Sequence, residues 1–372
     1  MSRRGHGEGS IYLRSDGRWA ASISLEGGKR KTFYGKTRKE VQEQLKTALY
    51  DQQKGMLATG PQQTVEQFCN QWLEAHKATI RIRSYERYEE LMRIHIIPAL
   101  GHHQLQKLTA QQIQAFYTQK LNEGLSPTTV NGLHAILHKA LDDAVRLGVL
   151  ARNVCGAVSP PRRAHYEIQP LSMEQSQQLL AAAKGHNLEA LFVLALTTGM
   201  RRGEILALKW QDIDFTHNTL QVRRIFTRRP GNRYIEAEPK TEKSRRSIML
   251  APLVVELLKQ HQTRQVETKQ QAGANWQERG LVFCTSLGTP LNPSKVVDRF
   301  KTLLKRAGLP EIRFHDLRHS AATILLSMGV HPKVVQELLG HNQISMTMDI
   351  YSHVLPTMQQ DAVSKLNDAL QG

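Results

Sequence analysis

The sequence predicts a multidomain α+β protein, and three observations along its 372 residues lead to that fold class. The first 35 residues alternate in the manner of short strands, residues 64–150 carry apolar side chains at helical spacing, and residues from about 170 to 372 mix both patterns. At roughly 150 residues per domain, the length favours two or three domains. We therefore expect a small three-stranded sheet plus helix, a four-helix bundle-like domain, and a mixed, mainly helical α/β domain.

The N-terminal stretch carries the strand signals. "SIYLR" and "RWAASISLEGGKRKTFYG" divide into three short strands, with Gly27 and Gly28 supplying a turn between two β-rich runs. A helix follows in "TRKEVQEQLKTALYDQQKG", where Thr37 and Glu40 are spaced as a capping box. We predict that residues 1–58 form a separate module.

This first module is strongly basic, because residues 1–60 hold 12 Lys and Arg against 6 Asp and Glu. Simple solvation would explain such a surface, but aromatic side chains alternate with the cations, which favours contact with DNA. The predicted DNA-contacting cations are Arg14, Arg18, Lys29, Lys31 and Lys36, with Trp19, Phe33 and Tyr34 interleaved.

A helical domain follows the turn-rich break "GMLATGPQQ". Capping residues indicate four helix starts, at Thr64, Ser84, Thr109 and Ser126. We place this domain at residues 64–153. The segment "ARNVCGAVSPPRRAHYEIQPLS" has three prolines and no periodicity, so we expect an extended linker over residues 151–170.

The third domain, placed at residues 165–372, mixes the two patterns. Helices are predicted at "MEQSQQLLAAA", "LEALFVLAL" and "RGEILAL", and strands at "TLQVRRIFTRR" and "SRRSIML". Further helices are expected from "PLVVELLKQ" to a C-terminal tail. The helical majority leads us to expect a mainly helical α/β domain.

The charge of the whole chain restricts the class of partner. Lys and Arg number 50 against 33 Asp and Glu, which gives a net charge of +17 and a sequence pI near 9.9. A positive field of this size attracts polyanions, so nucleic acid is the expected partner. An anionic membrane would suit the same charge, but no run approaches the ~18 apolar residues of a spanning helix, and the N-terminus lacks a signal-peptide core. We expect a soluble, cytoplasmic protein.

The cysteines carry no obvious chemistry. The chain has three cysteines, Cys69, Cys155 and Cys284, which lie far apart in the sequence. This pattern makes neither a disulfide framework nor a thiolate zinc site, so we expect buried small hydrophobic residues in a reducing compartment.

The stretch "HDLRHSAATILL" allows two interpretations. His315 and His319 are four residues apart, as two zinc ligands on a helix are. However, the general base of a zinc protease is a glutamate where this chain has Asp316, and Arg318 would place a cation beside the metal. Alternatively, His315 and Arg318 share one helix face as a grip for a phosphate, and this interpretation fits the chemistry better.

A second phosphate-binding cation is indicated in "TTGMRRGEILALKW". Gly199 ends an apolar helix, and Arg201 follows beside the start of the next one. Glu204, three residues further on, can hold the Arg201 side chain in place. Two guanidinium groups directed at one phosphodiester stabilise the negative charge that grows on its oxygens during displacement at phosphorus.

Five motifs, "TTGMRRGEI", "PKTEKSRRSI", "HDLRHSAAT", "LGH" and "DIYSHV", occur in an order that resembles the catalytic domain of the tyrosine recombinases. This family includes the phage and integrative-element integrases, and the motifs span residues 197–354. The basic, strand-rich start is similar to the arm-type DNA-binding module of larger integrases, and the four-helix unit is similar to their core-binding domain. The resemblance thus implies a catalytic domain of tyrosine-recombinase type.

The resemblance also implies roles for single residues. Arg201 and Arg318 would clamp the scissile phosphate, with His341 as a further phosphate-binding residue. His315 would transfer protons, and Lys240 would protonate the leaving 5′ oxygen.

Tyr351 matches the nucleophile of the family, so the implied intermediate is a 3′-phosphotyrosine with a free 5′ hydroxyl. A phenol with an unperturbed pKa near ~10 needs nearby cations and a proton acceptor to attack at neutral pH. Because the covalent link conserves the phosphodiester energy, we expect neither a metal nor a nucleotide cofactor. Two assignments stay open: Lys243 is an alternative to Lys240, and His319 suits a structural role better than a catalytic one.

The implied function is site-specific recombination that integrates or excises a mobile element. The implied partners are double-stranded DNA with core and arm-type sites, further copies of the chain in a homo-tetramer, and an accessory DNA-bending or directionality factor, all at the nucleoid in the cytoplasm. The alternative from another class is a sequence-specific DNA-binding protein on the same scaffold without catalysis. A type IB topoisomerase would share the phosphotyrosine step, but the separate arm-type module favours assembly on specific sites.

Overall fold

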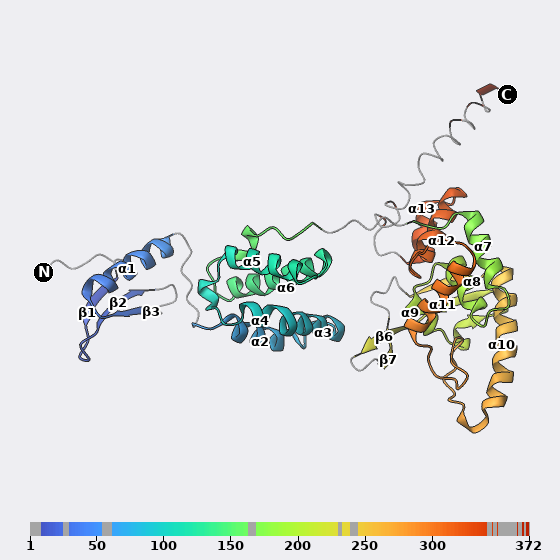
Figure 1. Ribbon diagram of the computed structural model, residues 1–372, viewed down its shortest axis with the longest axis horizontal. Coiled ribbons are helices and arrows are strands. Elements are labelled where there is room, and N and C mark those ends of the chain that lie inside the picture. Colours follow the sequence, from blue (N-terminus) through green and yellow to red (C-terminus); the bar gives the residue numbers. More distant parts are fainter. Residues whose placement is uncertain are drawn as a thin grey trace. The chain divides into compact units, whose positions relative to one another are not determined.

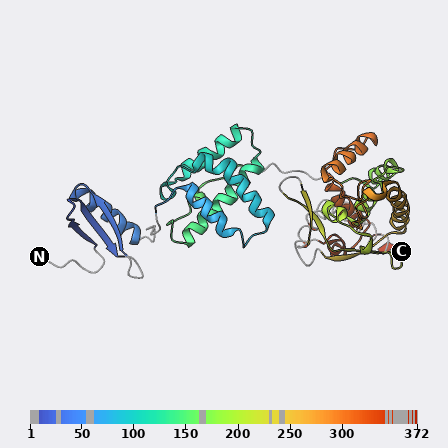
Figure 2. The same cartoon turned by 90° about the horizontal axis from the view of Figure 1, so that it is seen from below.

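The structure of the protein is a computed structural model that describes residues 9–24, 30–53, 62–162, 169–229, 233–238 and 245–340, with isolated positions at 344, 348, 363, 367, 370 and 371. The chain divides into two compact units, Met1–His165 and Tyr166–Gly372. Figures 1 and 2 show the helices and strands of each unit from two directions.

A small antiparallel sheet and one helix begin the first unit. The elements are β1 (Ser10–Leu13), β2 (Trp19–Ser24), β3 (Arg30–Gly35) and α1 (Arg38–Gln53), with strand order β1-β2-β3. Successive side chains of a strand point to opposite faces, so Ala21 and Ile23 of the central strand pack against Val41 and Leu45 of α1. Figure 2 shows α1 behind one face of the sheet, as predicted. Gly27 and Gly28 lie outside the described residues.

The N-terminus of α1 forms only half of the predicted capping box. Thr37 Oγ1 accepts from the backbone N of Glu40 at 3.2 Å. The carboxylate of Glu40 accepts instead from the backbone N of Lys36, at 2.9 Å. In a capping box the carboxylate would accept from the backbone N of Thr37, so the donor here is the residue before the expected one.

The rest of the first unit is helical. Its elements are α2 (Val65–His76), α3 (Ile82–Leu91), the π-helical turn η2 (Met92–Ile96), α4 (Ile97–Leu100), η3 (Leu105–Lys107), α5 (Ala110–Asn122), α6 (Pro127–Arg146) and η4 (Val154–Ala157). Thr64, Thr109 and Ser126 each cap a helix as predicted. The predicted start at Ser84 was wrong, because Ser84 already donates its backbone N to Arg81 O at 2.8 Å inside the first turn of α3.

The predicted linker also begins later than expected. Cys155 and Val158 are buried in the same core as α2, α5 and α6. The side chain of Asn153 caps η4 by accepting from the backbone N of Cys155 at 2.9 Å. Local capping and burial therefore hold residues up to Val158 in the helical domain, although the sequence has no periodicity there.

The second unit mixes helices with short strands. Its helices are α7 (Met173–Ala183), α8 (Glu189–Thr198), α9 (Arg202–Leu206), η5 (Trp210–Asp212), α10 (Pro252–Ala272), η8 (Gly273–Asn275), α11 (Pro293–Arg306), α12 (Asp316–Ser327) and α13 (Pro332–Leu339). A three-stranded antiparallel sheet has the order β4 (Ile213–Asp214), β5 (Thr219–Val222), β8 (Arg246–Met249). A hairpin pairs β6 (Ile225–Arg229) with β7 (Arg233–Ala237).

Helix α8 forms the centre of this unit. Almost every side chain from Ala190 to Thr198 is buried, and Phe192 contacts Phe300 of α11 and Phe314 before α12. A helix that is apolar on all sides must be surrounded by other elements, and α7, α10 and α12 pack against it (Figure 1). Among the described helices, none is both long enough and apolar enough to cross a bilayer. The three cysteines are free; Cys69 and Cys155 are buried as predicted, and Cys284 is half-buried.

Candidate active site

The first turn of α12 is built around a buried carboxylate. Asp316 has no exposed surface and accepts from the backbone N of Arg313 at 2.9 Å and from its Nη2 at 2.8 Å. This ion pair, at the positive end of the helix dipole, fixes the turn that carries His315 and Arg318. Asp316 is therefore engaged by an arginine. No group of three or more metal-ligating side chains occurs within the described ranges.

Arg318 is buried with an unsatisfied donor. Only 3% of the residue is exposed, and its Nη1 donates to the backbone O of Gly199 at 2.8 Å. Its Nη2 has no hydrogen-bond partner in the part of the chain that the structure describes. Burial, followed by the positive charges of Arg201 and Arg246, lowers the pKa of Arg318 to about 9. A buried guanidinium N–H without a partner is costly, so this atom marks a place where an anion would bind favourably.

Gly199 permits this arrangement. Helix α8 ends there in the left-handed conformation, at φ 59°, which glycine adopts without strain. A Cβ at this position would lie 2.3 Å from Cδ2 of Leu339 in α13. A larger residue would be strained at this φ and would require the side chain of Leu339 to move.

Arg201 lies at the N-terminus of α9, as the sequence predicted. Its Nη1 donates to Glu204 Oε1 at 2.8 Å, and its Nη2 donates to the backbone O of Gly340 at 3.2 Å. The side chain is 35% exposed, whereas that of Glu204 is 1% exposed. The predicted restraint of Arg201 by Glu204 is thus present in the structure, and one side of the guanidinium stays open to a ligand.

Arg246 of β8 was missed by the sequence argument. Its Nη2 donates to Glu204 Oε2 at 3.0 Å, and its Nε donates to the backbone O of Leu338 at 2.7 Å. A signal for it was available: Arg246 and Ile248 are two residues apart in a strand, so they share a face, and Ile248 is buried. A charged residue on the inner face of a strand needs a buried partner.

His315 directly precedes α12. Desolvation is the largest cause of the shift that lowers the pKa of His315 to about 4, and the neighbouring His319, Arg318 and Arg201 add to it. The ring is therefore neutral near pH 7 and able to accept a proton. His315 is nevertheless exposed, which leaves a substrate room to approach.

His319 lies one turn further along α12. Its ring meets that of His315 edge-on, with 5.4 Å between the centroids. The ring is half-buried, and its Nδ1 has no partner among the described residues. The expected structural role of His319 stays a prediction.

Three predicted active-site residues, Lys240, His341 and Tyr351, lie outside the described residues, as does the alternative Lys243. The structure therefore brings together Arg201, His315 and Arg318 of the predicted six. Gly340, whose carbonyl group contacts Arg201, is the residue immediately before His341 in the chain.

The predicted DNA-contacting cations of the first module are described except Lys29. Arg14 lies over the ring of Tyr34, 5.1 Å from its centroid, and also pairs with Asp16 at 3.3 Å. Arg18 pairs with the same carboxylate at 2.8 Å, Lys31 lies 5.8 Å from the ring centroid of Phe33, and Lys36 is exposed. In the strand register Tyr12, Ala20 and Tyr34 form one row, on the face opposite Ala21 and α1.

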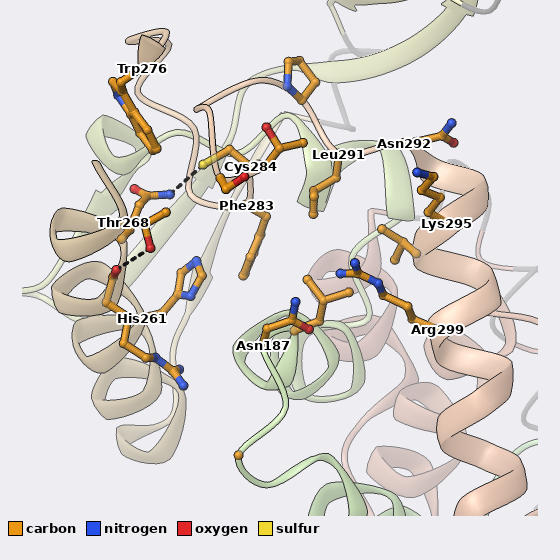
Figure 3. Close-up of a pocket in the computed structure, with 18 residues that line it drawn as sticks. Asn187, His261, Thr268, Trp276, Phe283, Cys284, Leu291, Asn292, Lys295 and Arg299 are labelled. Carbon is orange, nitrogen blue, oxygen red and sulfur yellow. Dashed lines mark hydrogen bonds between the residues drawn. The ribbon is translucent and has the colours of Figure 1, made fainter. Parts of the chain in front are cut away.

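A separate cavity of about 660 Å³ lies in the second unit. Figure 3 shows His261 and Thr268 of α10 on one side, Lys295 and Arg299 of α11 on the other, and Cys284 between them. None of Arg201, His315 and Arg318 lines this cavity. The predicted active site therefore does not coincide with this cavity but is a group of side chains that retains solvent exposure at Arg201 and His315.

Comparison with known proteins identifies the class. The sequence profile of the Phage integrase family matches residues 169–358, and that of the N-terminal SAM-like domain of phage integrases matches residues 64–121. A protein of Caldanaerobacter subterraneus subsp. tengcongensis named "Tyrosine recombinase XerC-like" is 36% identical over 364 residues, which cover 92% of this chain and 93% of that relative.

Two solved structures share the fold. The Tn1549 transposon integrase in complex with transposon right end DNA superimposes with a TM-score of 0.69 at 21% identity, over 80% of this chain and 99% of the other. A lambda integrase tetramer bound to a Holliday junction gives a TM-score of 0.57 at 19% identity, over 94% and 96% of the two chains. These structures confirm the predicted fold class.

The fold and the family profile together define a tyrosine recombinase, and the chain belongs to the phage integrase family. It is accordingly an enzyme that cleaves and rejoins DNA strands through a tyrosine-linked intermediate. The resemblance stated from the five motifs is thereby confirmed.

Proposed function

We propose that this protein is a site-specific integrase that moves a mobile element by attack of Tyr351 on a backbone phosphate of duplex DNA. One observation carries the proposal: the buried Arg318 keeps an unpaired Nη2 close enough to Arg201 for their charges to interact. Two cations that repel one another are held together by the surrounding protein. Their arrangement becomes favourable when a phosphate binds between them.

The roles that the family motifs imply give the chemistry of the step. The phenol oxygen of Tyr351 forms a bond to phosphorus while the bond from phosphorus to the 5′ oxygen breaks. Arg201 and Arg318 stabilise the charge on the two non-bridging oxygens, and His341 donates a further hydrogen bond. His315, neutral at the working pH, accepts the phenol proton. Lys240 gives a proton to the departing 5′ oxygen.

The product of this step is a 3′-phosphotyrosine and a free 5′ hydroxyl. A 5′ hydroxyl from another strand then attacks the phosphotyrosine, which restores a phosphodiester and frees Tyr351. One phosphodiester is broken and one is restored, so the reaction needs no nucleotide as a source of free energy.

We assign the parts of the chain to different DNA contacts. Residues 1–58 bind arm-type sites, residues 64–153 bind the core site, and residues 165–372 carry the chemistry. A homo-tetramer on double-stranded DNA is supported by the lambda integrase tetramer that shares the fold. The enzyme acts in the cytoplasm, where the chromosome lies, with an accessory DNA-bending or directionality factor as a further partner.

Trapping of the covalent adduct tests the proposal. On a nicked suicide substrate the 5′ fragment diffuses away, so wild-type protein should accumulate a DNA adduct in excess EDTA and without nucleotide. Tyr351→Phe removes only the attacking oxygen and should give no adduct while specific DNA binding is kept. An adduct formed by Tyr351→Phe would place the nucleophile elsewhere. Specific binding without any wild-type adduct would favour a DNA-binding protein that lacks catalysis.

A further inference from the structure

Glu204 lies at the centre of an ion cluster that the phosphate clamp alone does not explain. Its Oε1 accepts from Nη1 of Arg201 at 2.8 Å, and its Oε2 accepts from Nη2 of Arg246 at 3.0 Å. Oε2 also accepts from the backbone N of Arg201 at 2.9 Å. Because one buried carboxylate holds both arginines, a change in the position of Arg246 is transmitted to Arg201.

Both arginines also contact the end of α13. The last carbonyl groups of a helix have no partner within the helix and carry the negative end of its dipole. Arg246 Nε donates to the backbone O of Leu338 at 2.7 Å, and Arg201 Nη2 donates to that of Gly340 at 3.2 Å. The cluster thus joins β8, α9 and the C-terminal end of α13. Leu338 lies 92 residues from Arg246 in the sequence, and Gly340 lies 139 residues from Arg201.

We propose that Arg246 is a positioning residue for strand cleavage, which holds Arg201 and the end of α13 in the arrangement that meets the scissile phosphate. This inference rests on the proposed function, because it takes Arg201 as a phosphate-binding residue. The side chain of Arg246 is 7% exposed and bonded to protein atoms on both Nε and Nη2. It therefore acts through Arg201 and does not contact DNA.

The electrostatics of Glu204 supply a readout that a purely structural residue would not change. Burial raises the pKa of Glu204, but Arg246 and then Arg201 outweigh it, so the net pKa lies below the usual range. If Arg246 is removed, Glu204 loses the charge that lowers its pKa most and keeps Arg201 and the nearby Arg318 of α12 as counter-charges, so the pKa of this carboxyl rises towards the value that burial favours. A carboxyl takes up its proton as the pH falls through its pKa, and a protonated Glu204 no longer holds Arg201. The variant should therefore lose cleavage on the acid side.

The central variant is Arg246→Met in the full-length protein. We would measure single-turnover cleavage of a suicide substrate from about pH 6 to about pH 8.5, together with affinity for the same DNA. At about pH 8 we expect cleavage at least ~10-fold slower than wild type, with a further loss as the pH falls that the wild type does not show, and an affinity within ~3-fold. The double variant Glu204→Gln/Arg246→Met should lack the acid loss, because it has no carboxyl to protonate.

A matched control separates positioning from general destabilisation. Arg224 pairs through Nη1 with Asp212, which is also buried, in the same unit. Arg224→Met should therefore lower the free energy of unfolding, but cleavage per folded molecule should keep the pH dependence of the wild type. If Arg246→Met does not fold, Arg246→Lys tests the same idea, since it keeps the charge but cannot bond to both Leu338 and Glu204. It should cleave several-fold more slowly (~3-fold to ~10-fold), without the acid loss.

The outcomes distinguish a failure of the phosphate clamp from a failure of the positioning role of Arg246. Arg201→Ala should abolish adduct formation, and an active Arg201→Ala would overturn the phosphate clamp itself. If Arg201→Ala is inactive but Arg246→Met shows the pH profile of the wild type, only the positioning role of Arg246 is wrong. A wild-type cleavage rate for Arg246→Lys would overturn it as well.

Discussion

Arginine is used in opposite ways in the first module and in the catalytic unit. Arg14 and Arg18 both pair with the carboxylate of Asp16 at the surface, whereas Arg318 is 3% exposed and keeps an unpaired Nη2 in the described structure. Exposed ion pairs contribute little free energy and are screened by salt. A buried guanidinium with one unpaired N–H group instead raises the free energy of the DNA-free state, and a bound anion lowers it.

This difference between the two regions cannot be predicted from amino-acid composition. A count of basic residues predicted nucleic acid as the partner and applies equally to both regions. Burial and pairing distinguish them, because only a desolvated and preorganised guanidinium interacts strongly with the charge of a transition state. We therefore expect substitutions in the two regions to differ by orders of magnitude in effect.

The largest effect is expected for Arg318→Lys. Lysine keeps the charge but does not reach both the carbonyl group of Gly199 and the phosphate, so adduct formation should fall by about 10³-fold while DNA affinity changes little. Quench-flow or gel assays of single-turnover cleavage measure the loss. Arg18→Lys is the matched control and should leave cleavage unchanged. Cleavage by Arg318→Lys within tenfold of wild type would erase the contrast between the two regions.

An intermediate effect is expected when residues 1–60 are deleted. Cleavage of a short core site should be unaffected, but recombination between full attachment sites should fall by roughly 10-fold to 100-fold, because a second binding event on the same DNA is lost. The dependence of binding on salt should weaken at the same time. Recombination in vitro with both substrates checks the prediction. Equal recombination by the truncated and the full-length protein would leave the module without a role in site assembly.

The smallest effect is expected for a single exposed cation. Arg14→Ala removes a guanidinium that lies over Tyr34 on the sheet, and it should lower affinity for full attachment sites only about 2-fold to 5-fold, with the salt slope reduced by about one. Lys46→Ala makes the same charge change on α1. Equal effects of the two substitutions in a salt titration would show that the sheet has no special contact with DNA.

The features that were predicted correctly depend on short stretches of chain. Thr64, Thr109 and Ser126 cap their helices because a hydroxyl reaches a backbone N three residues ahead, whatever the tertiary structure. The same rule failed at Ser84, since the backbone of α3 had become helical at Ile82 without any side-chain cap. Val158 was assigned to a linker because its burial comes from contacts with a distant core that no local pattern reveals.

In the candidate site, too, contacts between residues close in sequence were predicted and contacts between distant residues were not. The restraint of Arg201 by Glu204 spans three residues and was predictable from spacing. Arg246 was overlooked because its partners, Glu204 and Leu338, are 42 and 92 residues away. The motif containing Arg246 drew attention to its lysines, while the inward side of the strand carried the buried arginine.

The arginines of the phosphate clamp contact residues far away in the sequence, and this has a consequence for the newly made chain. Arg318 is anchored to a carbonyl group 119 residues earlier, and Arg201 is anchored to one 139 residues later. Contacts between such distant residues form late in folding, because much of the chain must be ordered first. A ribosome-bound or proteolytically shortened chain that ends before Gly340 therefore has the cations but not their arrangement. Such a shortened chain would also lack Tyr351, so neither the arranged cations nor the proposed nucleophile would be present.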